Sequence, residues 1–134
     1  MKVNLRRSAE YKKVYQEGKR YSSSLVTAFV LVNGHADHRL GITVSRKISL
    51  TAVGRNRAKR LLREAFRLKS VSLANLKQKY DWVLNGRQAL LSVKMAAPLE
   101  EFGRIIERVA ADEGNSSKES YGREVSSNSF NKIL

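Results

Sequence analysis

The chain has 134 residues, a length that suits one compact domain, and a formal net charge of +14. Its hydrophobic fraction of 42% is too high for a wholly disordered basic segment. The absence of cysteine excludes disulfides, thiol catalysis and cysteine-based zinc sites, and the sequence shows neither a membrane-length apolar run nor a secretory signal. We therefore expect a soluble, cytoplasmic protein without a membrane partner. Its positive charge is expected to bind a polyanionic partner.

A short helix is predicted over residues 9–17, with Ser8 as its N-cap and Gly18 at its end. Tyr11 and Tyr15 are four residues apart and therefore share one face of this helix. Core packing is the ordinary role of such side chains. Basic residues flank both tyrosines, however, and this favours a role as platforms for nucleic-acid bases.

Two β-strands are predicted after this helix. Residues 25–32 are rich in β-forming side chains and end at the turn signal Asn33-Gly34. Residues 40–45 alternate apolar and polar side chains, as in a half-buried strand. We expect the two strands to pair with each other as a hairpin across the loop 33–38.

The longest predicted helix starts at Thr51 or an adjacent residue, runs to about Ser70 and carries much of the charge. Residues 46–69 hold nine Lys and Arg and a single acid, Glu64. At 100° per residue, four basic side chains fall within about a third of the helix circumference, namely Arg55, Lys59, Arg63 and Arg67. Uncompensated like charges destabilise a helix by a few tenths of a kcal/mol each. A phosphate-rich partner therefore explains this ridge better than a merely solvated helix face.

The last predicted elements are a strand over 80–84 and a final helix. Pro98 lies in the first turn of that helix, and Gly114 is expected to end it. From residue 114 to the end, Ser, Asn and Gly make up 11 of 21 residues, which indicates a flexible tail. The predicted organisation is one domain over residues 1–113 and a flexible tail over residues 114–134.

The most specific stretch is residues 55–67, which read RNRAKRLLREAFR and closely resemble the signature helix of the bacterial ribonuclease P protein subunit. That protein is the small basic partner of a catalytic RNA. Residues 11–18, 39–47 and 81–87 are also similar to segments of this family. Their order and spacing agree over about residues 3–110.

The resemblance implies an α+β fold, in which one compact domain has a sheet of about four strands and the element order α-β-β-β-α-β-α. It also implies a left-handed βαβ crossover around the helix that contains residues 55–57, against the general rule for such units. In the family, the RNA subunit removes the 5′ leader of precursor tRNA with bound Mg²⁺. We therefore expect the RNA to bind most of the Mg²⁺, and this chain to have no catalytic and no metal-binding residues.

The resemblance further assigns two sets of RNA contacts. The catalytic RNA, in a one-to-one complex, would be bound by Arg46, Lys47, Arg55, Asn56, Arg57 and Arg60. The single-stranded leader of precursor tRNA would be bound by Tyr11, Tyr15, Phe29, Thr43, Ser45, Lys59, Arg63 and Arg67. A cleft with aromatic and basic walls above a sheet suits a single RNA strand. The sequence indicates no protein partner.

Three other classes of protein fit the sequence less well. A protein-only nuclease needs a metal cluster or an acid–base pair, but the acids of residues 1–70 lack such spacing, and His35 and His38 are expected to be exposed in a loop. A helix-turn-helix DNA reader would not place strands directly before its basic helix. A basic ribosomal or other structural RNA-binding protein stays as the alternative, because only the motif argues against it.

Overall fold

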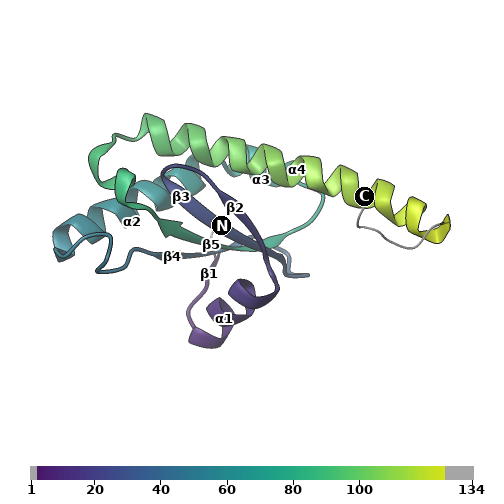
Figure 1. Ribbon diagram of the computed structural model, residues 1–134, viewed down its shortest axis with the longest axis horizontal. Helices are drawn as coiled ribbons and strands as arrows, with labels where there is room; N and C mark the ends of the chain where they lie inside the picture. Colours follow the sequence, from purple (N-terminus) through teal and green to yellow (C-terminus); the bar gives the residue numbers. More distant parts are fainter. Residues whose placement is uncertain (1–2, 126–134) are drawn as a thin grey trace.

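The computed structural model describes residues 3–125, in which a mixed β-sheet carries helices on both faces (Figure 1). In this range the strands are β1 (Val3–Asn4), β2 (Lys19–Ser22), β3 (Val26–Val32), β4 (Arg39–Thr43) and β5 (Tyr80–Gly86). The helices are α1 (Ser8–Glu17), α2 (Ala52–Leu68), α3 (Ser70–Ala74), the 3₁₀ helix η1 (Gln88–Ser92) and α4 (Ala96–Val125). Helix α1 covers one face of the sheet, and α2 and α4 cover the other.

The strand order across the sheet is β1-β4-β5-β3-β2. Strand β5 is antiparallel to β3 and parallel to β4, so the predicted hairpin between residues 25–32 and 40–45 is wrong. The turn at Asn33-Gly34 does form, and Gly34 takes the left-handed backbone conformation with a φ of 68°. Strand β5, however, is buried on both faces, and such a strand is stable only in the middle of a sheet. It therefore separates the two strands that are neighbours in sequence.

The α+β class and the predicted element order are confirmed. Elements α1-β2-β3-β4-α2-β5-α4 follow the expected succession, and β1, α3 and η1 are short additions to it. Four of the described strands have four residues or more, and β1 adds a two-residue edge. Helix α2 connects the parallel neighbours β4 and β5, as the expected βαβ unit requires. The left hand of this crossover stays a prediction.

The main core lies between the sheet and the helix pair α2 and α4. Trp82 of β5 is fully buried there, and its ring packs edge-on against Phe102 and Phe66, with centroids 5.5 and 6.3 Å away. Burying a side chain of this kind contributes roughly 2 kcal/mol or more. A smaller cluster of Leu5, Val14 and Val83 fills the space beneath α1 on the opposite face.

Helix ends follow local signals with two exceptions. The Oγ1 atom of Thr51 accepts a hydrogen bond from the Gly54 backbone N–H at 3.0 Å, so α2 begins as predicted. Helix α1 begins at Ser8, which was expected to be its N-cap, and Arg7 takes the cap position.

The predicted end of the last helix at Gly114 is wrong, because α4 continues to Val125. Pro98 does lie in its first turn. A glycine inside a helix costs only about 1 kcal/mol relative to alanine, which is too little to stop a helix by itself. Of the predicted flexible tail, residues 114–125 are helical, and residues 126–134 lie outside the described part of the chain.

Candidate nucleic-acid interface

Three predicted leader-binding residues meet on the face of the sheet that carries α1. The Tyr15 ring packs edge-on against Phe29 of β3, with centroids 4.9 Å apart and an interplanar angle of 83°. The Tyr15 hydroxyl donates to Asn85 Oδ1 at 2.9 Å, and Thr43 Oγ1 donates to the same oxygen at 2.5 Å. Tyr15 keeps 38% of its surface exposed. Aromatic, hydroxyl and amide groups from α1, β3, β4 and β5 therefore share one accessible patch.

Asn85 is a member of this patch that sequence reasoning misses. It lies directly opposite Thr43 in the parallel pairing of β4 and β5, and opposite Thr27 in the antiparallel pairing with β3. An amide directly after the apolar run Trp82-Val83-Leu84 is the signal that could have indicated it. With both hydroxyls on its oxygen, Asn85 fixes the position of the Tyr15 ring.

Tyr11 lies one turn earlier on α1 and crosses β4 closely at Gly41. A Cβ atom at position 41 would lie only 2.7 Å from the Tyr11 ring, so glycine is required for this approach. A pocket joins this tyrosine to the basic side of α2 and is lined by Asn4, Leu5, Tyr11, Leu40, Ile42, Lys59 and Arg63. Burial raises the pKa of the Tyr11 phenol, which keeps the hydroxyl neutral at physiological pH. The structure thus places Lys59 and Arg63 in one pocket with Tyr11, and all three are predicted leader-binding residues.

Two other predicted leader-binding residues lie elsewhere. Arg67 is near the end of α2, forms an ion pair with Glu64 and lines a different pocket with His38 and Lys79. Ser45 is exposed beyond the end of β4, where its carbonyl oxygen accepts two backbone hydrogen bonds of the following turn. Leader contacts of Arg67 and Ser45 stay predictions.

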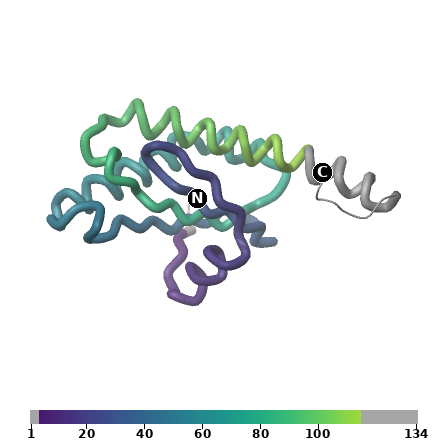
Figure 2. The backbone as a smooth tube through the Cα atoms, in the orientation of Figure 1, coloured from purple at the N-terminus to yellow at the C-terminus, as the bar shows by residue number. Residues whose placement is uncertain are grey.

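The residues predicted to bind the catalytic RNA lie around the segment that leads into α2. Figure 2 shows this segment and the start of α2 at one end of the molecule. Four of the six side chains are exposed, namely Arg46, Lys47, Asn56 and Arg60. Arg55 and Arg57 are half-buried.

Arg55 and Arg57 each hold a neighbouring loop. Arg55 Nη1 donates to the carbonyl oxygens of residues 49 and 50 at 3.0 and 3.1 Å. Arg57 donates through Nη1 to Leu91 and through Nη2 to Val93, at 3.2 and 2.7 Å. A guanidinium has five N–H donors, so each side chain keeps others for a ligand. These two arginines therefore fix the neighbouring backbone segments in place and also contribute positive charge to the predicted RNA-binding surface.

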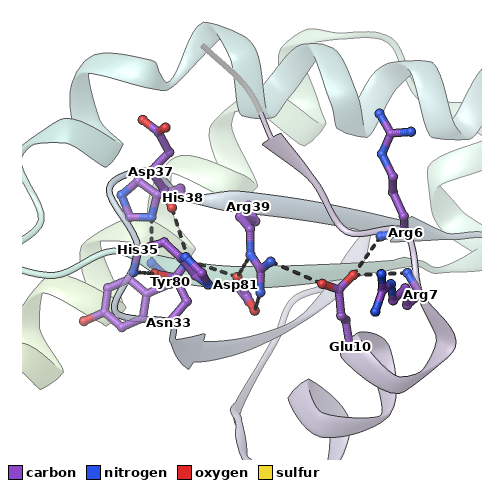
Figure 3. A network of polar contacts seen from close by, with 10 residues as sticks. All are labelled: Arg6, Arg7, Glu10, Asn33, His35, Asp37, His38, Arg39, Tyr80 and Asp81. Atoms are coloured by element: carbon purple, nitrogen blue, oxygen red, sulfur yellow. Dashed lines mark hydrogen bonds and ion pairs between the residues drawn. The ribbon is translucent and has the colours of Figure 1, made fainter.

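A polar network anchors the start of α1 to the sheet (Figure 3). Arg39 of β4 donates through Nε and Nη2 to both carboxylate oxygens of Asp81, each at 2.7 Å, and through Nη1 to Glu10 at 3.2 Å. Asn33 Nδ2 also donates to Asp81, at 2.9 Å. Glu10 Oε1 accepts from the backbone N–H groups of residues 6 and 7, and these bonds lower the pKa of its carboxyl. Sequence reasoning misses this network, which positions the aromatic face of α1.

His38 is half-buried, so the expectation that it is exposed is wrong, whereas His35 is exposed as predicted. Nδ1 of His38 accepts hydrogen bonds from the Tyr80 backbone N–H and the Trp82 indole N–H, both at 3.1 Å. Nε2 lies 3.0 Å from the Leu73 carbonyl oxygen and donates to it. Desolvation by burial lowers the pKa of this imidazole. The hydrogen bonds of the folded protein therefore require the neutral form of His38.

Two further properties of residues 3–125 bear on function. Within this range, no group of three or more His, Asp or Glu side chains is placed to hold a metal ion. No helix in the same residues is both long enough and apolar enough to cross a membrane.

Comparison with known proteins decides the family. The profile of the Ribonuclease P family matches residues 1–110. The chain belongs to the Ribonuclease P protein family. It is 34% identical over 106 residues to the ribonuclease P protein component of Caldanaerobacter subterraneus, covering 79% of this chain and 88% of that protein. It is 41% identical over 91 residues to the component of Clostridium novyi, covering 65% and 77%.

Solved ribonuclease P proteins have the same fold. The protein from Thermotoga maritima is 28% identical and superposes with a TM-score of 0.69, covering 78% of this chain and 96% of that chain. The protein from Staphylococcus aureus is 24% identical with a TM-score of 0.67, covering 78% and 93%. The resemblance read from residues 55–67 is thereby confirmed and favoured over a ribosomal protein.

Proposed function

We propose that this chain is the protein component of a ribonuclease P and binds two RNAs: the catalytic RNA subunit and the single-stranded 5′ leader of precursor tRNA. Its role is to raise substrate affinity and to support Mg²⁺-dependent endonucleolytic removal of the leader. The catalytic centre belongs to the RNA subunit in this proposal. A complex of this kind acts on precursor tRNA in the cytoplasm.

The observation that carries the proposal is the leader face, which we define as Tyr11, Tyr15, Phe29, Thr43, Asn85, Lys59 and Arg63. Stacking of a base on an aromatic side chain contributes about 1–3 kcal/mol per base and tolerates any sequence. Lys59 and Arg63 of α2 line a pocket together with Tyr11 of α1, where they can neutralise backbone phosphates. Thr43 and Asn85 add hydrogen-bonding groups on the sheet floor. This combination fits a single RNA strand and is more than a duplex-binding surface needs.

A second surface, the assembly face, supports binding of the catalytic RNA in a one-to-one complex. It consists of Arg46, Lys47, Arg55, Asn56, Arg57 and Arg60. Arg55 hydrogen-bonds the loop before α2 at Ser49, and Arg57 hydrogen-bonds Val93, so both segments are fixed to α2 next to the exposed cations. As the family resemblance implies, we assign the Mg²⁺ to the RNA subunit and no metal-binding step to this chain.

Reconstitution with a bacterial ribonuclease P RNA tests the proposal. At low Mg²⁺ the protein is expected to increase the rate of precursor-tRNA cleavage by this RNA and to cleave nothing alone. Within the assay, Tyr15→Ala should weaken binding of leader-bearing substrates by roughly 5- to 150-fold, as the loss of one stacked base predicts. Binding of mature tRNA should not change.

Two controls make this experiment specific. Tyr15→Phe keeps the ring and removes only the hydroxyl that Asn85 accepts, so it should retain most of the leader affinity. Arg60→Ala changes an exposed side chain of the assembly face and should weaken RNA assembly instead. Cleavage by protein freed of all RNA, or equal rates with and without protein, would contradict the proposed function.

A further inference from the structure

An apolar tip stands at the entrance to α2. It consists of Leu50 and Val53, whose side chains are 86% and 79% exposed. Among the large hydrophobic residues within residues 4–114, only Val71, at 74%, approaches this exposure. Two such side chains within four positions form a local patch of the kind that marks an interaction site more often than a single exposed residue does.

Within the described part of the chain, the fold leaves this tip mostly uncovered. Leu50 precedes the N-cap Thr51, and an apolar residue at that place usually packs against the fourth residue of the helix. Here the fourth residue is Arg55, whose guanidinium turns back to the carbonyl oxygens of residues 49 and 50. Leu50 is therefore exposed on a loop whose backbone is held in place.

The surroundings of the tip are cationic. No Asp or Glu occurs between residues 38 and 63, whereas Arg46, Lys47 and Arg60 are exposed on either side of the tip in sequence. The first turn of α2 also contains no acidic residue. A polyanion that offers apolar surface complements such a patch, and RNA with unpaired bases has both properties.

We propose that the apolar tip packs against unpaired nucleobases of the catalytic RNA. This inference rests on the proposed function and adds to it a contact that does not depend on charge. Leucine and similar side chains can insert against or between bases, where they bury apolar area and unstack neighbouring bases. The cations around the tip would hold the phosphates while Leu50 and Val53 recognise a place where the RNA exposes base faces.

Salt dependence separates the two kinds of contact. Each phosphate contact contributes roughly 0.7–0.9 to the slope of log K against log salt concentration, because counterions are released. Apolar contacts release none. The double variant Leu50→Ser/Val53→Ser should therefore bind a bacterial ribonuclease P RNA about 10- to 100-fold more weakly at every salt concentration, with an unchanged slope.

Two comparison variants complete the experiment. Arg46→Ala/Lys47→Ala should reduce the slope, since it removes charge from the same surface. Val71→Ser removes an equally exposed valine on α3 and should leave affinity and slope unchanged. Circular dichroism and thermal unfolding of each variant, which alters only exposed side chains, check that the fold is retained.

The outcomes distinguish this inference from the proposed function. Failure of the wild-type protein to bind the RNA would overturn both. Wild-type binding with an unchanged affinity in the Leu50→Ser/Val53→Ser variant would overturn the inference alone. Self-association of the wild type in sedimentation, lost in that variant without any change in RNA affinity, would assign the tip to a second copy of the chain and would also overturn it.

Discussion

His38 connects three parts of the fold through one imidazole ring. It comes from the loop before β4, accepts two N–H groups from β5 and donates to the carbonyl of Leu73 in α3. The ring also stacks on Tyr80, with centroids 6.0 Å apart. Nδ1 can accept these bonds only while it is unprotonated, so the network requires the neutral side chain. Nearby Lys79 further disfavours the charged form, and Glu113 partly opposes this effect.

This arrangement predicts an acid-sensitive free energy of unfolding. The pKa of His38 is lowered in the folded protein, so the unfolded chain binds the proton first as the pH falls below about 6.5. The stabilisation is fully present above that pH and decreases toward the folded pKa. Glu10, Glu101 and Asp112 have lowered pKa values, so their contribution to stability is lost only below about pH 5.

Urea unfolding between about pH 7.5 and 5 measures this dependence. His38→Asn keeps an acceptor near the Nδ1 position but loses the Nε2 donor to the Leu73 carbonyl, so it should be less stable at neutral pH by about 1–3 kcal/mol, and without an imidazole its stability should vary less over this range. His35→Ala, altered at an exposed position of the same loop, should behave as the wild type. Identical pH profiles for wild type and His38→Asn would show that another group is responsible.

Helix α1 depends on few contacts with the sheet. Its apolar side buries Val14 with Leu5 and Val83, and the Arg39 network ties its first turn to β4 and β5. The carboxylate of Asp81 is buried and pairs with Arg39 through two hydrogen bonds, whereas Glu10 is more exposed. We therefore expect the Arg39–Asp81 pair to stabilise the whole domain and the Arg39–Glu10 pair to stabilise mainly the attachment of α1.

Substitutions on the two sides of Arg39 separate these contributions. Arg39→Met leaves the Asp81 carboxylate buried without its cation, so the whole domain should lose about 3–5 kcal/mol of stability. Glu10→Gln removes only the link to α1 and should cost less than about 1 kcal/mol overall. Hydrogen exchange should then become faster in α1 and stay unchanged in β3 and β5. Equal acceleration in the helix and the sheet would contradict a local role for Glu10.

Elements with a clear local pattern are predictable from the sequence, whereas which elements lie next to each other in the sheet is not. The alternation at residues 40–45 and the Thr51 cap specify β4 and α2 without reference to the rest of the chain. Strand order depends on β5, which is separated from β3 by the whole of α2, so the expected hairpin does not form. Tyr15 and Thr43 could be named from the motif, but Asn85 becomes visible only once β4 and β5 are in register.

At the scale of the molecule, two acids of α4 bind groups of the sheet and its loops instead of facing the basic surface. Glu101 accepts from the Ser24 hydroxyl and the Leu25 backbone N–H, at 2.6 and 3.1 Å. Asp112 accepts from Lys19 and from the Tyr21 hydroxyl, both at 2.6 Å. These carboxylates dock α4 on the sheet through residues 19–25 and not through the cations of residues 46–63. The net charge of +14 therefore includes an uncompensated basic surface that repels itself in the free protein.

Screening of that repulsion should stabilise the protein without RNA. At neutral pH, added NaCl weakens the interactions of exposed cations, which decay over about 10 Å at 0.1 M salt. The Arg39–Asp81 pair is mostly buried and is screened less. We expect the Tm to rise by a few degrees with added salt, since ~1 kcal/mol corresponds to roughly 4 °C in a domain of this size.

The variant Lys59→Gln/Arg60→Gln tests whether the basic surface is the source of this effect. With two fewer like charges on α2, it should have a higher Tm than the wild type at low salt and a smaller rise as salt is added. Ser92→Gln, at an exposed position of η1, is a matched change that keeps the charge and should retain the wild-type salt dependence. A Tm that falls with added salt would mean that attractive pairs such as Lys19–Asp112 outweigh the repulsion. The positive charge would then cost the free protein little, and its stability would give no reason to expect a polyanionic partner.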